Sequence, residues 1–126
     1  IRIDERAQNH EEILQNLRET SQFNGATVHI KRQVLNQIGG YRDYFNCFAY
    51  QDYDWTSRIA ESFVSINIPE SLYYYRQHVK SNSKHIDPKR AVSKDLVIWL
   101  AQDRARNNSD YLDRKEIKKV DMFVEC

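Results

Sequence analysis

Glycine and proline are scarce in this chain, and their positions divide it into short segments. The 126 residues include 3 glycines and 2 prolines. Asn24-Gly25 is a turn signal, and Gly39-Gly40 is typical of the end of a helix. Pro69 stops a strand, whereas Pro88 suits the first turn of a helix. The apolar pattern between these points then indicates which element each segment forms.

Apolar spacing predicts both helices and short strands. A period near 3.6 indicates a helix, and alternation over a few residues indicates a strand. Asp4 is expected to cap the first helix. The predicted helices cover residues 5–21, 31–38, 51–63, 88–106 and 110–124, and the predicted strands cover 26–30, 64–68 and 72–76. The sequence therefore predicts an α/β fold over residues 1–85, followed by a helical tail over 86–126.

Composition excludes several classes of protein. Hydrophobic residues make up 40% and charged residues 29%, which is typical of a folded domain. A net charge of +1 indicates no nucleic-acid partner. Cys47 and Cys126 form no CxxC pair, which favours a reduced, cytoplasmic setting. Because the chain begins at Ile1, we expect it to be part of a longer protein.

A run of motifs between residues 24 and 83 is more informative than composition. It comprises small residues, a basic pair, an apolar helix, Gly-Gly-aromatic-x-acid, an acidic helix start with an Arg, a strand, and Tyr-Arg-x-His-x-x-Ser. These motifs occupy residues 26–30, 31–32, 34–38, 39–43, 51–58, 64–68 and 75–81. Each motif alone is weak, but their order and spacing are specific. The chain resembles the C-terminal half of a family-2 glycosyltransferase with the GT-A fold.

The resemblance implies a fold and a reaction. Residues 1–85 would be the acceptor-side half of a partial GT-A-like, nucleotide-diphospho-sugar transferase core. The whole enzyme would move a sugar with inversion from a nucleotide-sugar donor to a glycan or other hydroxyl acceptor, in bacterial polysaccharide or cell-surface glycan synthesis. It would be cytoplasmic or membrane-associated and would use Mg²⁺ or Mn²⁺. The family's Asp-x-Asp metal motif lies in its N-terminal half, so we expect the present chain alone to be inactive.

Asp52 is the candidate catalytic residue. Glycosyl transfer to an alcohol needs a base that accepts the hydroxyl proton, and a single carboxylate can do this. By the resemblance, Asp52 matches the family's catalytic Asp. An ordinary helix N-cap or first-turn aspartate is the alternative. The family usually has Glu before this Asp, where this chain has Gln51.

The resemblance also assigns binding residues. The diphosphate that leaves in such a transfer is negatively charged, and a cation and polar side chains stabilise it. His78 matches a family His that joins the metal or the diphosphate, and a surface histidine is its alternative. Trp55 could instead be a core residue, and the glycine pair could be a simple helix cap. The candidate substrate-binding residues are Gly39, Gly40, Tyr41, Trp55, Arg76 and Ser81.

A second function remains open. The chain could be a non-catalytic α/β-helical protein-interaction module, in which Asp52 only caps a helix and His78 only meets solvent. In either case we expect a homodimer, formed through an exposed sheet or through the tail helices, because an unpaired strand edge recruits another strand. The packing of the tail helices against each other is the second structural expectation.

Overall fold

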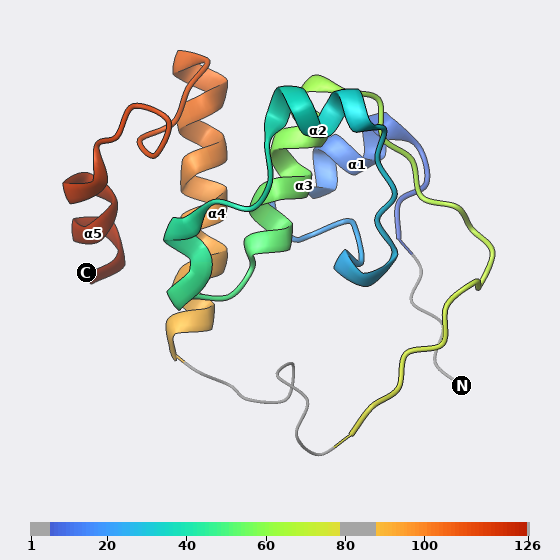
Figure 1. Ribbon diagram of the computed structural model, residues 1–126. Helices are drawn as coiled ribbons and strands as arrows, with labels where there is room; N and C mark the ends of the chain where they lie inside the picture. Colours follow the sequence, from blue (N-terminus) through green and yellow to red (C-terminus); the bar gives the residue numbers. More distant parts are fainter. Residues whose placement is uncertain (1–5, 79–87, 126) are drawn as a thin grey trace.

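The computed structural model describes residues 6–78 and 88–125, and its regular structure there is helical (Figure 1). Five α-helices and two short 3₁₀ helices follow one another. In order they are α1 (His10–Asn16), η1 (Gly25–Thr27), α2 (Arg32–Ile38), η2 (Asp43–Cys47), α3 (Gln51–Ser62), α4 (Pro88–Asn107) and α5 (Ile117–Glu125). No helix among the described residues is long and apolar enough to cross a membrane.

The α/β prediction is wrong, because the described residues contain no strand or sheet and so no GT-A-like core. At the first predicted strand, residues 26–30, the side chain of Asn24 accepts a hydrogen bond from the Ala26 N–H at 3.0 Å and begins η1 instead. Such local side-chain bonds compete with strand pairing.

The other two predicted strands, at residues 64–68 and 72–76, are irregular backbone without a partner strand. The Asn67 N–H donates to the Gln8 carbonyl at 3.1 Å, and the Ser65 N–H donates to His10 Nδ1 at 3.2 Å. The Asn67 amide also donates to two further carbonyls, those of Ala7 and Gln22. Residues 64–68 are therefore hydrogen-bonded to α1 and to loop residues. In a sheet, these bonds would go to a neighbouring strand.

The predicted helices are present, but some of them begin or end at other residues than predicted. α1 is much shorter than the predicted 5–21: Asn9 caps it by accepting from the Glu12 N–H, and the proposed cap Asp4 lies outside the described residues. α2 ends at Gly39, whose φ of 80° is a conformation that favours glycine. α3 follows the prediction for 51–63 within one residue.

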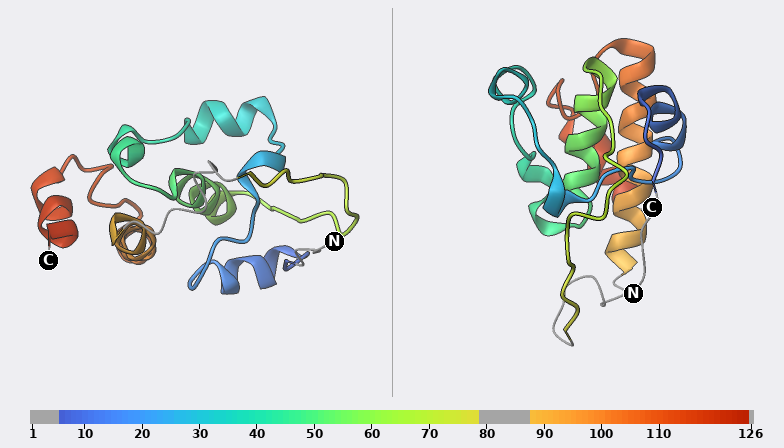
Figure 2. Two further views of the ribbon diagram at one scale, coloured as in Figure 1. Left: turned by 90° about the horizontal axis from the view of Figure 1, so that it is seen from below. Right: turned by 90° about the vertical axis from the view of Figure 1, so that its right-hand side faces the viewer.

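α3 lies at the centre of the molecule and contacts three other helices, α1, α2 and α4 (Figures 1 and 2). Its buried residues recur at helical spacing and include polar ones: Tyr53, Asp54, Thr56, Ser57, Ile59 and Ala60. The buried hydrophobic cluster joins α1, η2, α3, α4 and α5, and consists of Ile13, Leu17, Phe45, Tyr53, Ala60, Leu96, Val97, Leu100 and Val120.

Two helices form where the sequence predicted a helical tail. α4 covers the predicted 88–106 plus one residue, and α5 returns alongside it (Figure 1). Residues 111–115 form a turn where the sequence predicted the start of the last helix. The Trp99 ring lies between two aromatic rings, stacking on Tyr111 and on Phe123 at 4.5 Å between centroids. This stack joins the two helices and the turn between them.

Candidate functional site

Asp52 lies in the first turn of α3, as the sequence predicted, and is half-buried. Its Oδ1 accepts a hydrogen bond from the Tyr53 N–H at 2.9 Å, which orients the carboxylate. The residue before α3's first turn, Tyr50, has a φ of 69°. A bulky side chain in this left-handed conformation is a backbone outlier, and such strain clusters at functional sites.

The backbone of Gly25 packs directly against the Asp52 carboxylate. A Cβ at position 25 would lie 2.7 Å from Asp52 Oδ2, which is closer than real Cβ contacts, and 3.2 Å from the Asp52 Cβ, which is a tight contact. Only glycine permits this approach. The Asn24-Gly25 turn therefore forms one wall beside Asp52, although the sequence indicated it only as a turn.

Two side chains of α3 hold the glycine pair. Trp55 Nε1 donates to the Gly39 carbonyl at 2.8 Å, and Arg58 donates to the Gly40 carbonyl at 2.8 Å. Tyr41 stands edge-on to the Trp55 ring, with 5.2 Å between centroids. Four predicted binding residues, Gly39, Gly40, Tyr41 and Trp55, are thus brought together beside the helix that carries Asp52.

An ionic cluster lies behind this face of α3. Asp54 is fully buried and pairs with both Arg42 and Arg58, the second pair being the (i, i+4) ion pair that the sequence indicated. Arg42 also donates to Asp110 at 2.8 Å, and Arg104 joins Asp110 to Glu61. The cluster therefore ties the loop after α2 to α3 and to the residues that follow α4.

Charge pairing in this cluster outweighs burial at Arg42, Arg104 and Asp110. Burial acts to lower the pKa of Arg42, but Asp54 and Asp110 raise it overall. Burial acts to raise the pKa of Asp110, but Arg42 and Arg104 lower it overall. At Arg58 burial prevails and lowers the pKa. Asp54 acts to raise this pKa, but the nearby positive charges of Arg42 and Arg104 lower it further. Arg42 and Asp110 therefore remain charged at neutral pH.

The C-terminal members of the predicted site lie elsewhere. Arg76 and His78 are exposed, on the segment that projects away from the helices in Figure 1 and in the right-hand view of Figure 2. Ser81 lies outside the described residues. Within residues 6–78 and 88–125, no three His, Cys, Asp or Glu side chains gather as metal ligands. His78 is therefore in no such group among the residues that the structure describes.

Sequence reasoning missed Gly25 beside Asp52, and it missed Arg42 and Asp110 in the ionic cluster behind this face. Position 25 was visible only as a glycine in a turn. Arg42 follows the glycine pair and could have been suspected as a partner for Asp54. Asp110 is 68 residues from Arg42, and no sequence signal connects them.

The comparisons with known proteins do not extend this description. No protein-family model matches the chain, and neither the curated proteins nor the solved structures include one that matches it.

Proposed function

We propose that this chain is the acceptor-side part of an inverting glycosyltransferase that uses a nucleotide-sugar donor. One observation carries the proposal: the Asp52 carboxylate lies against a side-chain-free backbone at Gly25, in the first turn of a helix that also holds Gly39-Gly40. The ordered motifs of the sequence supply the reaction class. The proposal rests on this local arrangement and on no GT-A core.

Asp52 is the base in this proposal. The acceptor hydroxyl gives its proton to the carboxylate while its oxygen forms a bond to the anomeric carbon of the donor sugar. The bond from that carbon to the diphosphate breaks, and the nucleoside diphosphate leaves with the bonding electrons. Oδ1 already accepts the Tyr53 N–H, so we assign the proton to Oδ2, on the Gly25 side.

The glycine pair and the aromatic rings form the acceptor surface. A Cβ at Gly39 or Gly40 would meet no atom within 4 Å, so the space beside the turn is open. Tyr41 is 50% exposed, and its ring offers a flat apolar face of the kind that packs on sugar rings. An acceptor sugar placed on this turn lies next to the helix that carries the base.

The test uses the full-length gene product. Release of nucleoside diphosphate is measured with a panel of nucleotide sugars, Mn²⁺ or Mg²⁺, and an array of glycan acceptors. Asp52→Asn should lower kcat at least 100-fold, within the range of about 10² to 10⁴ that general-base catalysis contributes. Asp95→Asn, an exposed aspartate on α4, is the matched control and should retain wild-type turnover.

A wild-type kcat in Asp52→Asn would assign the base to another residue. No transfer by the wild type with any donor would contradict the glycosyltransferase proposal itself.

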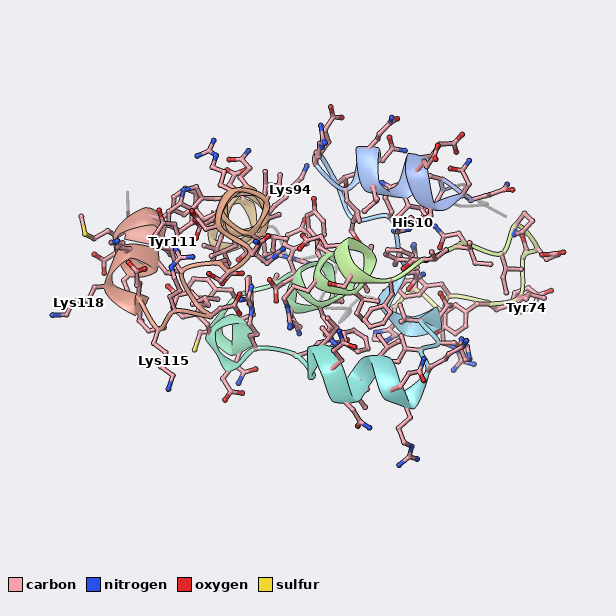
Figure 3. All side chains as sticks on the ribbon, turned by 90° about the horizontal axis from the view of Figure 1, so that it is seen from above. His10, Tyr74, Lys94, Tyr111, Lys115 and Lys118 are labelled. Carbon is pink, nitrogen blue, oxygen red and sulfur yellow. The ribbon has the colours of Figure 1, made fainter. Side chains whose placement is uncertain are left out.

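A protein-interaction function has one observation in its favour. Apolar side chains on the projecting segment are exposed, including Val64 at 82%, Leu72 at 75% and Tyr74 at 93%. Tyr74 stands at the outer edge of the molecule, opposite α5 with Lys118 (Figure 3). Exposed apolar side chains gathered on one segment are typical of an interaction surface. Partner binding that survives Asp52→Asn but is lost on changes in this segment would favour the interaction function.

A further inference from the structure

We propose that Arg58 is a positioning residue for the acceptor, acting through the glycine pair. This inference rests on the glycosyltransferase proposal above and adds a role that its motif did not assign. Arg58 does not face the acceptor surface directly. It is 10% exposed at its side chain and is held between the Asp54 carboxylate and the backbone at the end of α2.

The guanidinium makes three separate hydrogen bonds. Its Nε donates to Asp54 Oδ2 at 3.1 Å, and its two terminal nitrogens donate to the Ile38 carbonyl at 3.1 Å and the Gly40 carbonyl at 2.8 Å. Only an arginine presents donors in this rigid fork. Asp54 is fully buried, so it fixes where the fork points.

Fixing these carbonyls also fixes the amide groups beside them. The described residues contain no cis peptide bond, and in a trans peptide the N–H points opposite to the C=O. The Gly39 carbonyl faces Trp55, and the Gly40 carbonyl faces Arg58. The N–H groups of Gly40 and Tyr41 therefore point away from α3.

The backbone turn that carries these two amides is uncrowded. Neither glycine has a side chain, and the space where a Cβ would stand is empty to 4 Å. Gly39 also has a φ of 80°, which any other residue would adopt only with strain. Two adjacent N–H donors beside the Tyr41 ring suit a hydroxyl oxygen of a sugar. Arg58 thus orients a pair of donors toward the acceptor.

The experiment compares Arg58→Met with Arg104→Met in the full-length gene product. Arg104 is the matched control because it is another little-exposed arginine of the same ionic cluster, but it bonds Glu61 and Asp110 and not the glycine pair. The 126-residue chain has two tryptophans, so ¹⁵N NMR of the indole N–H groups, recorded on this chain, gives one resonance for Trp55 and one internal reference for Trp99.

Arg58→Met should move the Trp55 indole resonance and speed its exchange with solvent, because the Ile38 and Gly40 carbonyls, on either side of the Gly39 carbonyl that Trp55 bonds, are no longer held. Arg104→Met should leave that resonance in place. The KM for the acceptor should rise about tenfold in Arg58→Met with kcat within a factor of about two of the wild type, as expected when binding hydrogen bonds are misplaced and the base is untouched. Arg58→Lys keeps a charge beside Asp54 but lacks the fork, and should raise the KM as well.

The outcomes separate this inference from the function on which it rests. An unmoved Trp55 resonance, or an equal movement in Arg104→Met, overturns the positioning role even if transfer occurs. A moved resonance with an unchanged acceptor KM also overturns it and leaves the glycosyltransferase proposal standing. If Arg58→Met does not fold, Arg58→Lys decides by the same two measurements. Absence of transfer by the wild type overturns the proposed function, and this inference with it.

Discussion

The contact between Gly25 and Asp52 is a residue-scale constraint that can be tested directly. Gly25→Ala places a Cβ within 2.7 Å of Asp52 Oδ2, so the carboxylate must turn away. We expect kcat to fall about tenfold and the free energy of unfolding to fall by about 1 kcal/mol, as for small overpacked sites. Steady-state kinetics and urea unfolding measure the two effects.

Gly40→Ala is the control for stability in that experiment. A Cβ at position 40 meets nothing within 4 Å, so the free energy of unfolding should stay within about 0.5 kcal/mol of the wild type. Equal losses of stability at positions 25 and 40 would show that the close approach to Asp52 is not what requires glycine.

Asp110 makes the ionic cluster sensitive to acid. Burial raises its pKa, but Arg42 and Arg104 lower it overall below the ordinary value of 3.8. A carboxylate with a depressed pKa in the folded state stabilises the protein above its unfolded pKa, and this contribution is lost as pH falls through the folded pKa. The wild type should therefore lose stability as pH falls below about 5, the range where the unfolded carboxyl begins to bind a proton.

Asp110→Asn tests the sign of this dependence. The variant should be less stable than the wild type at pH 7, because Arg42 loses a charged partner, and the difference should shrink as pH falls toward 3. Urea unfolding at several pH values measures it. A constant difference between the two proteins across this range would show that the Asp110 charge does not stabilise the fold.

At the scale of elements, the aromatic stack joins α4 to α5. Trp99 lies between Tyr111 and Phe123, with rings inclined by 14° and 10°. Trp99→Ala removes both contacts, and we expect the free energy of unfolding to fall by about 2–4 kcal/mol, somewhat less than for a fully buried tryptophan. Thermal or urea unfolding gives the value.

Met122→Ala is the matched control on α5. Met122 is 66% exposed, so its truncation should change the free energy of unfolding by less than about 0.5 kcal/mol. If Trp99→Ala were as mild as this control, the stack would contribute nothing to the packing of the two helices.

Self-association is the prediction that belongs to the whole molecule. The sequence led us to expect a dimer through a bared sheet, and the described residues have no sheet. They do have an exposed row of alternate apolar side chains on one segment: Val64 at 82%, Ile66 at 66% and Ile68 at 63%. Burial of such a row is favourable at about 25 cal/mol per Å². We therefore still propose self-association, now through this segment.

Ile66→Lys should shift the chain to a monomer, because a charge on the row opposes its burial. Met122→Lys is the matched control, since that side chain has the same exposed fraction on another element. Sedimentation velocity at high micromolar concentration distinguishes the species. A wild-type monomer at that concentration contradicts the prediction.

Local signals in the sequence determined α2, α3 and α4. Their apolar periods, the glycine at the end of α2 and the proline at the start of α4 are each contained within one segment, so no distant residue is needed to read them. The same holds for the Asp54–Arg58 ion pair and for the place of Asp52 in the first turn of α3. These features could be predicted because helical hydrogen bonds join residues four apart.

Tertiary structure decided what depends on residues far apart in the chain. Residues 64–68 and 72–76 have the composition of strands, but a strand exists only with a partner, and here residue 67 bonds to Gln8 instead. The contact of Gly25 with Asp52 and the pairing of Arg42 with Asp110 likewise join distant positions. Composition and spacing do not predict these long-range contacts, because the contacts result from how the helices pack around α3.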